Sequence, residues 1–372
     1  MTVTLIRRPV AFSSAALIAL PFVEIVAACV DGVNASWIGR SSPPIRGVLL
    51  GLAPGVAALL QAAKTRLAAS AHPNGPRSVL RMDPLLFAEA SLSYSAELTF
   101  LAKLSAAQRA HDSILCVGLD PEPASIPESL GRGPQAAVRF LRRIVRATAP
   151  HVCAYKPNLA FYERYGSAAM DVLALTLQAI PADIPVILDA KRGDVPNTSA
   201  AYADALFDSF HADAATVAPY VGLDSIEPFT TGARFALVLA RTSNPGAGDF
   251  QDLEVAGRPL YERVVERCVE RFGADRCGFV VGATYPDEAR RLRALAPDRL
   301  FLMPGIGSQG GEIGLALRAG LDANGAGVLP SASRSVLYAS RSDDFEKAAG
   351  EAARTLREAA NAARASALAR GR

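Results

Sequence analysis

The sequence predicts an α/β protein with a (β/α)8 TIM barrel, preceded by an N-terminal extension of different character. Three observations support this prediction. From about Glu97 onward, short apolar runs alternate regularly with amphipathic stretches of helix length. The short runs are apolar at consecutive positions, which is typical of parallel strands buried on both faces. Eight such units in roughly 270 residues match the strand count and size of a closed barrel.

The expected elements follow one another along the chain as strand and helix. The expected strands are residues 114–120, 152–156, 185–190, 214–218, 235–240, 278–282, 300–304 and 327–330. The clearest expected helices are residues 136–147, 168–179, 199–210, 258–272 and 344–365. A doubly wound open sheet is the structural alternative, but it usually binds its ligand at a glycine-rich first turn. The first strand here is followed instead by the acidic, proline-rich stretch DPEP, so the barrel is favoured.

Residues 1–93 do not continue this pattern, and we assign them to an extension outside the barrel domain of residues 94–372. Near the start of the chain, Arg7-Arg8 is followed by an apolar run, and the two together resemble a signal peptide or a poor membrane span. Pro21 and Glu24 interrupt the run, and a carboxylate near the middle of a span is costly in hydrocarbon. Three interpretations stay open: a membrane or export element, a small helical appendage, or a start codon assigned upstream of a true start near Met82.

The composition excludes several classes of function. A net charge of +3 over 372 residues gives no electrostatic reason to expect a nucleic-acid partner. The five cysteines are scattered and form no C-x-x-C pair, and the four histidines show no metal-ligand spacing. We therefore expect no disulfide framework, no metal site and a cytoplasmic location.

Charged residues gather where strands are expected to end, and a barrel places its functional residues at those ends. They are Asp120, Lys156, Asp189, Lys191 and Asp194. Because strand side chains two positions apart point the same way, Asp189 and Lys191 are expected to point together into the barrel mouth, with Lys156 beside them. Such an array of alternating charges suits a reaction that needs a strong local field. Asp194 has an alternative as the N-cap of a helix with Pro196 in its first turn.

A phosphate site is expected after the last two strands, where barrels often bind phosphate. The stretch MPGIGSQGGE (residues 303–312) contains four glycines whose backbone amides can approach an anion closely. The stretch PSASRS (residues 330–335) supplies Arg334, whose planar guanidinium can pair with a phosphate group.

At this point the motifs resemble a known family. DAKRGD, followed by Thr198 and Tyr202, resembles the signature of orotidine 5'-phosphate decarboxylase, the last enzyme of UMP biosynthesis. The blocks ILCVGLDPEP, CAYKPNLAFYERYG, RTSNPGAGDFQ, VVGAT, PGIGSQGG and SASRSVLYAS occur in the order expected for the bacterial form called type 2. The resemblance runs from about Glu97 to the C-terminus. D-x-K-x-x-D by itself is shared with related sugar-phosphate decarboxylases.

The resemblance implies decarboxylation of orotidine 5'-phosphate to UMP and carbon dioxide, by a homodimer and without a metal or organic cofactor. Lys191 would donate the proton to C6 of the pyrimidine, and Lys156, Asp189 and Asp194 would complete an alternating tetrad. Asp194, with Thr198, would reach into the site of the partner subunit.

The implied substrate-binding residues are Asp120, Thr198, Ser243, Gln251, Gly305, Gly307, Gln309 and Arg334. Asp120 would hold the ribose hydroxyls and Ser243 the pyrimidine edge. Arg334 and the glycine amides would hold the phosphate, with either Gln251 or Gln309 closing over it.

Other functions stay open on the residues alone. A metal-assisted sugar-phosphate decarboxylase or epimerase is the nearest alternative, and a Schiff-base aldolase using Lys191 is a weaker one. A membrane-tethered barrel that binds nucleotides without turning them over is the alternative outside enzymes.

Overall fold

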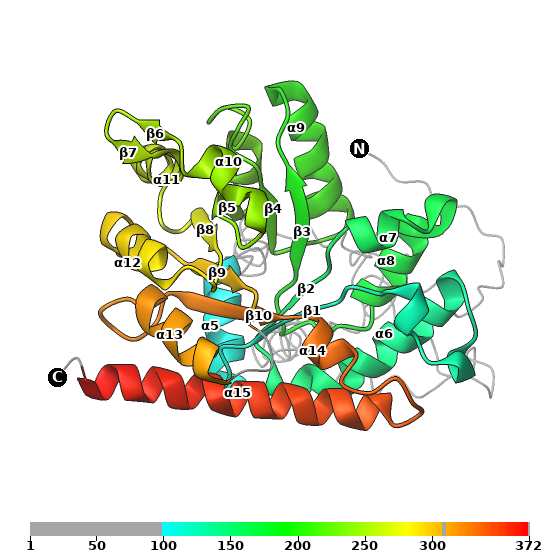
Figure 1. Ribbon diagram of the computed structural model, residues 1–372. Helices are drawn as coiled ribbons and strands as arrows, with labels where there is room; N and C mark the ends of the chain where they lie inside the picture. The colour runs from blue at the N-terminus through cyan, green and yellow to red at the C-terminus, as the bar shows by residue number, and fades with distance from the viewer. Residues whose placement is uncertain (1–98, 307–309, 371–372) are drawn as a thin grey trace, which may run out of the picture. The chain divides into compact units, whose positions relative to one another are not determined.

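A closed eight-stranded parallel barrel forms the centre of the computed structural model, which describes residues 99–306 and 310–370. The strand order is β2-β1-β10-β9-β8-β5-β4-β3, and all pairings are parallel. Bridges from Tyr155 to Val186 and from Asn158 to Asp189 join β2 to β3 and complete the ring (Figure 1). The predicted fold class is confirmed. The proposed division at residues 93 and 94, and the extension itself, lie outside the described residues.

Each predicted strand corresponds to an observed one, with ends that differ by at most two residues. The observed strands are β1 (Cys116–Gly118), β2 (Ala154–Lys156), β3 (Ile187–Arg192), β4 (Ala214–Val217), β5 (Ala236–Arg241), β8 (Cys277–Val281), β9 (Phe301–Pro304) and β10 (Val328–Ala332). β6 (Glu254–Val255) and β7 (Arg258–Pro259) form a small antiparallel hairpin in the loop after β5. This hairpin is why the helix predicted from residue 258 begins two residues later.

Helices surround the barrel on its outside (Figure 1). They include α6 (Pro134–Thr148), α8 (Ala169–Leu177), α9 (Pro196–Ala203), α11 (Leu260–Arg271), α12 (Pro286–Leu295), α13 (Gly310–Gly320) and α15 (Phe345–Arg370). Shorter helices α7 (Ala160–Glu163), α10 (Gly248–Gln251) and α14 (Arg334–Leu337) lie in loops that follow strands. The helix predicted over residues 199–210 is confirmed as α9, which starts earlier with Pro196 in its first turn, and a π-helical continuation, Asp204–Ser209. In the described part of the chain, no helix is both long and apolar enough to cross a membrane.

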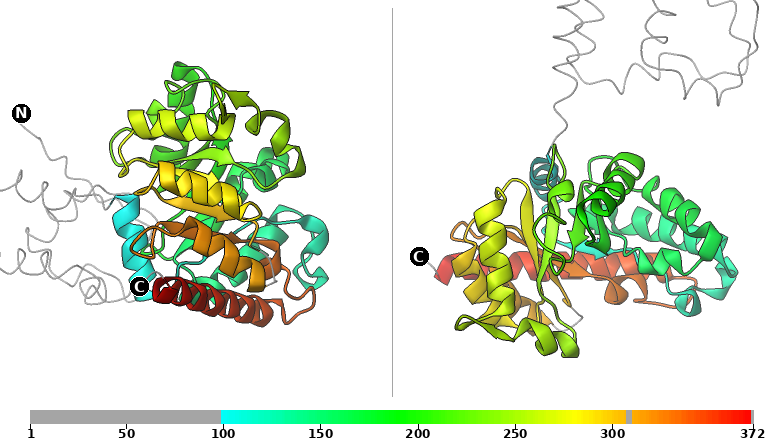
Figure 2. Two further views of the ribbon diagram at one scale, coloured as in Figure 1. Left: turned by 60° about the vertical axis from the view of Figure 1, so that its left-hand side comes forward. Right: turned by 90° about the horizontal axis from the view of Figure 1, so that it is seen from above.

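Strand alternation divides the core into two layers. One layer fills the barrel interior with side chains such as Cys116, Ile187 and Leu329, and α5 (Phe100–Ala110) packs Phe100 and Leu104 against it. Figure 2 shows α5 at one end of the barrel. The other layer lies between the sheet and the helices. Because successive strand residues point to opposite faces, a strand in this fold must be apolar at nearly every position.

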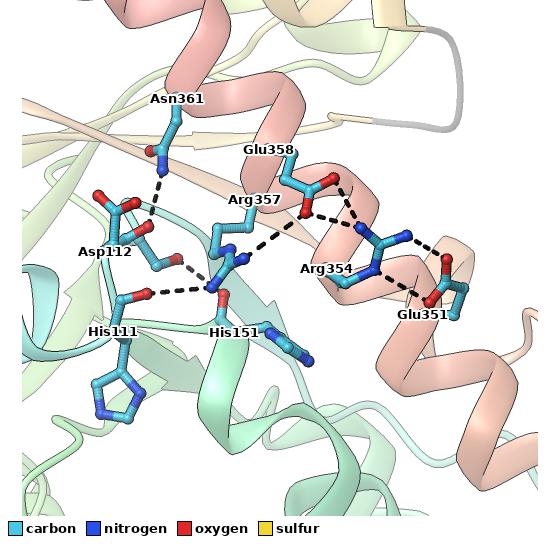
Figure 3. A network of polar contacts seen from close by, with 9 residues as sticks. His111, Asp112, His151, Glu351, Arg354, Arg357, Glu358 and Asn361 are labelled. Atoms are coloured by element: carbon cyan, nitrogen blue, oxygen red, sulfur yellow. Dashed lines mark hydrogen bonds and ion pairs between the residues drawn. The ribbon is translucent and has the colours of Figure 1, made fainter.

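The C-terminal helix α15 is attached to the barrel by both apolar and polar contacts. Its buried residues recur three or four positions apart, as expected for one helix face: Phe345, Ala349, Ala353, Leu356 and Ala360. On an adjoining face, Arg357 donates to the carbonyl oxygen of His111, and Asn361 donates to that of Asp112 at 2.7 Å (Figure 3). The helix thereby covers the segment that enters β1.

Candidate active site

The carboxyl ends of β2 and β3 bring three charged side chains into direct contact. Lys156 Nζ donates to Asp189 Oδ2 at 2.8 Å, and Lys191 Nζ donates to Asp189 Oδ1 at 2.6 Å. The side chains of Lys156 and Asp189 are only 8% and 10% exposed, whereas that of Lys191 is 48% exposed. The expected juxtaposition is confirmed. It leaves one buried ammonium group beneath the carboxylate and one accessible ammonium group beside it.

The backbone near Lys191 differs from the regular alternation that the sequence suggested. Between two regular pairs of the β3–β4 ladder, residues 189–191 of β3 together face the single residue Thr216 of β4. Lys191 has a φ of 47°, a left-handed conformation that costs a non-glycine residue about 1–2 kcal/mol. The contact between Lys191 and Asp189 was therefore predicted correctly for the wrong reason. A bulge, rather than the strand period, turns the ammonium group toward the carboxylate.

The charges of the cluster stabilise one another. Burial by itself would raise the pKa of the Asp189 carboxyl group, but the ammonium groups of Lys156 and Lys191 hold this pKa well below its usual range. Burial would likewise lower the pKa of Lys156, but Asp189 and Asp120 raise it above the ordinary lysine value. At neutral pH the cluster thus contains a buried carboxylate and a buried ammonium ion, whose field is oriented before any ligand arrives.

Asp120 lies at the carboxyl end of β1 and is held by groups from two other loops. Its Oδ2 accepts a hydrogen bond from Ser333 Oγ at 2.6 Å, and its Oδ1 accepts one from the backbone amide of Asn158 at 3.2 Å. The hydroxyl of Tyr338 donates to the carbonyl oxygen of Asp120 at 2.9 Å. The carboxylate is buried and its position is set by the loop that carries Arg334.

Asp194 and Thr198 do not join the lysine–aspartate cluster within this chain. Asp194 Oδ1 accepts a hydrogen bond from the adjacent amide of Val195 at 2.7 Å, and Val195 rather than Asp194 occupies the N-cap position of α9. The capping alternative for Asp194 is therefore wrong. Ser199 Oγ accepts from the Asp194 amide and donates to its carbonyl oxygen, which fixes the loop and leaves the Asp194 carboxylate partly exposed.

Ser243 lies among the loops after β5, β8 and β9. A Cβ atom added to Gly282 would lie 3.0 Å from Ser243 Cβ, and one added to Gly305 would lie 3.9 Å from it. Gly305 has a φ of 95°, which favours glycine at this position. The structure thus brings Ser243 next to the start of the glycine-rich segment. Gly307 and Gln309 lie outside the described residues.

The amide of Gln251 is engaged at the base of its own loop. Its Oε1 accepts from the Thr242 amide at 2.9 Å and from Arg241 Nη1 at 3.3 Å, and its Nε2 donates to Thr242 Oγ1 at 2.9 Å. The guanidinium of Arg241 is buried and lies 4.2 Å from the centroid of the Tyr285 ring. Arg334, at the start of α14, has an exposed side chain.

Arg192, for which the sequence suggested no role, links β3 to two helices. It donates to Glu163 Oε1 at 2.9 Å and to the carbonyl oxygen of Ala190, and its guanidinium lies 4.8 Å from the centroid of the Tyr202 ring. These contacts hold the end of β3 against α7 and α9.

Two polar residues that the sequence did not single out touch the charged groups directly. Ser333 contacts Asp120, as described above. Thr216 Oγ1 donates to Asp189 Oδ1 at 2.8 Å and accepts from the Lys191 amide at 3.0 Å. The sequence did contain an indication of the role of Thr216. It is the polar residue of an otherwise apolar strand and lies two positions after the interior residue Ala214, so its side chain is expected to point into the barrel interior as well. In the parts of the chain that the structure describes, no group of three or more His, Cys, Asp or Glu side chains is arranged to hold a metal ion.

Comparisons with known proteins agree with one another. Residues 113–349 match the model of the orotidine 5'-phosphate decarboxylase / HUMPS family. The chain is 45% identical over 272 residues to orotidine 5'-phosphate decarboxylase of Bordetella pertussis, a match that covers 72% of this chain and 100% of the relative. It is 48% identical to the Thermomicrobium roseum enzyme of the same name, covering 70% and 94%. The solved structure of Leishmania donovani OMP decarboxylase matches with a TM-score of 0.63 and 40% identity, covering 72% and 98%.

Proposed function

This chain belongs to the orotidine 5'-phosphate decarboxylase / HUMPS family, and on that premise we propose that it converts orotidine 5'-phosphate to UMP and carbon dioxide, the last step of UMP biosynthesis. It is a carboxy-lyase. The observation that carries the proposal is the buried Asp189 carboxylate held between the ammonium groups of Lys156 and Lys191. The curated relatives at 45–48% identity are matched over nearly their whole length and share this activity in their names.

The proposed chemistry needs only groups of the protein. The bond between C6 and the carboxylate carbon breaks, carbon dioxide leaves, and the electron pair stays on C6. The Lys191 ammonium group stabilises this carbanion electrostatically and then transfers a proton from Nζ to C6. Asp189 keeps the ammonium group oriented through a hydrogen bond of 2.6 Å. The neutral lysine regains its proton from solvent, to which its half-exposed side chain has access.

The remainder of the substrate is proposed to bind around this centre. Asp120 would accept hydrogen bonds from the ribose hydroxyls, and Ser243 would contact the pyrimidine edge. Arg334 and the backbone amides of the segment that begins at Gly305 would hold the phosphate. Gln309 or Gln251 would close over it. The contact of Ser243 with Gly305 and the link from Asp120 to Ser333, next to Arg334, support this arrangement.

We further propose that the active form is a homodimer in which Asp194 and Thr198 act in the partner's site. Four large apolar side chains are exposed close to Asp194 in the sequence or on the next loop: Val195, Tyr202, Tyr220 and Val221. Tyr220 is 88% exposed. An apolar group of this kind beside partly exposed functional residues suits a second copy of the chain.

Mixing inactive subunits tests the shared site. Asp194→Ala and Lys191→Ala subunits are each expected to be inactive. A 1:1 mixture after subunit exchange should recover about a quarter of the wild-type activity, because half of the dimers are mixed and each of these has one intact site of two. A mixture that stays inactive after exchange, verified by native mass spectrometry, would contradict the shared site.

The function itself is tested by the loss of orotidine 5'-phosphate absorbance with the purified full-length chain, with and without EDTA. Turnover that is unaffected by EDTA is expected. A strict requirement for magnesium together with no turnover of orotidine 5'-phosphate would favour the sugar-phosphate alternative, and borohydride trapping of a substrate adduct at Lys191 would favour the aldolase.

A cytoplasmic location is also proposed from the composition, and fractionation of cells that express the tagged chain tests it.

A further inference from the structure

We propose that Thr216 is a positioning residue for the proton donor: its hydroxyl holds both the backbone and the charge partner of Lys191. This inference rests on the proposed function, since it assigns Thr216 a part in the decarboxylation. Its basis is the place of Thr216 in the sheet. It is the one residue of β4 that faces the bulge formed by residues 189–191 of β3.

At the bulge, the backbone of β4 does not supply the hydrogen-bond acceptor that the Lys191 amide needs. Where three residues of one strand face one residue of the next, the regular ladder of amide-to-carbonyl bonds is interrupted. The amide of Lys191 donates instead to the side-chain oxygen of Thr216 at 3.0 Å. The regular pattern resumes immediately afterwards, where the Ala218 amide donates to the Arg192 carbonyl oxygen at 2.7 Å. Thr216 therefore supplies the acceptor that keeps Lys191 in its left-handed conformation.

The same hydroxyl also determines how the carboxylate is presented. A hydroxyl has one proton and two lone pairs. Because Thr216 accepts from the Lys191 amide, its proton is free to be donated to Asp189 Oδ1 at 2.8 Å. This is the oxygen that accepts from Lys191 Nζ. One buried side chain, 1% exposed, thus fixes both ends of Lys191, the amide directly and the ammonium group through Asp189.

Loss of the Thr216 hydroxyl is expected to affect catalysis more than substrate binding. Lys191 and Asp189 are proposed to act on the carboxylate and C6 of the substrate, whereas the phosphate and ribose are held elsewhere in the barrel mouth. Loss of the Thr216 hydroxyl should allow Lys191 to leave its left-handed conformation and should misplace Nζ. A displaced proton donor lowers the rate steeply, because it no longer starts in the reactive geometry.

Three variants of the full-length chain test the proposal by their kcat, KM and affinity for UMP. Thr216→Val keeps the shape and removes the hydroxyl, and kcat should fall about 10- to 100-fold, with KM and UMP affinity changed less than about threefold. Thr216→Ser keeps the hydroxyl and should stay within about threefold of wild type in kcat. Thr176→Val is the matched control, since Thr176 is fully buried and its Oγ1 donates to the carbonyl oxygen of Val172 within α8 at 2.7 Å; its kcat should be unchanged.

The outcomes separate the two proposals. If the wild type turns over orotidine 5'-phosphate and Thr216→Val keeps full kcat, Thr216 has no positioning role, while the proposed function stands. An equal fall in kcat for Thr176→Val would mean that any lost buried hydroxyl has this effect and would also refute the inference. Should Thr216→Val prove unfolded by circular dichroism, Thr216→Ala replaces it, with the same predicted fall in kcat. A wild type without turnover refutes the proposed function, and the inference with it.

Discussion

Replacement of the buried carboxylate is the most demanding test of the charge cluster. Asp189→Asn keeps the shape of the side chain and removes its charge, which leaves Lys156 Nζ without a carboxylate 2.8 Å away. The Lys156 side chain is 8% exposed, and an ion that loses its directly bonded carboxylate in such a place costs about 3–5 kcal/mol of unfolding free energy. The pair with Lys191 contributes less, about 0–1 kcal/mol, because the Lys191 side chain is 48% exposed. We therefore expect Asp189→Asn to lower the unfolding free energy by about 3–5 kcal/mol.

A double-mutant cycle separates this effect from ordinary disruption of the core. Lys156→Met removes the buried ammonium group with similar volume, and the variant with both substitutions contains neither buried charge. Since an apolar or neutral replacement of both partners is often tolerated, the double variant should be less destabilised than the sum of the single variants, by about 1–3 kcal/mol. Urea unfolding at pH 7, followed by circular dichroism, measures these differences from midpoints at constant m value. A cost of Asp189→Asn below about 1 kcal/mol, or strictly additive single costs, would refute the reasoning.

Three further predictions concern pH, the proton donor and the loop after β5. The pKa of Asp189 is lower in the folded state than in the unfolded state, so unfolding takes up a proton at low pH. The unfolding free energy of the wild type should therefore fall as the pH drops below about 4. The urea midpoints of Asp189→Asn should lack this part of the fall. Lys191→Ala should reduce kcat more than about 1000-fold in the absorbance assay and keep UMP affinity within about tenfold by calorimetry, whereas near-normal turnover would exclude Lys191 as proton donor. Gln251→Ala, which removes the contacts that hold Thr242 beside Ser243, should raise KM about tenfold with a smaller change in kcat. An unchanged KM would show that this loop is ordered without Gln251.

The strands and their polar ends were predictable because both signals are local. A strand buried on two faces must be apolar at nearly every position, so the eight runs stand out from the amphipathic helices between them. Their charged ends follow directly in the sequence, and parallel strands of a barrel bring these ends to one mouth. Asp120, Lys156 and Asp189 could therefore be assigned to one site without coordinates. The hairpin after β5 was missed, since its short strands, Glu254–Val255 and Arg258–Pro259, carry almost no periodicity.

By itself, then, the sequence determined the barrel, the end of the barrel that carries the chemistry, and the types of charge found there. The tertiary structure alone decided how those charges are held. The left-handed conformation of Lys191 depends on a hydrogen bond to Thr216, 25 residues away, and the position of Asp120 depends on Ser333, 213 residues away. Such contacts form only when the ring of strands closes. No pattern in a single strand contains them, because a side chain's hydrogen-bond partner is set by the register of the neighbouring strand rather than by its own sequence.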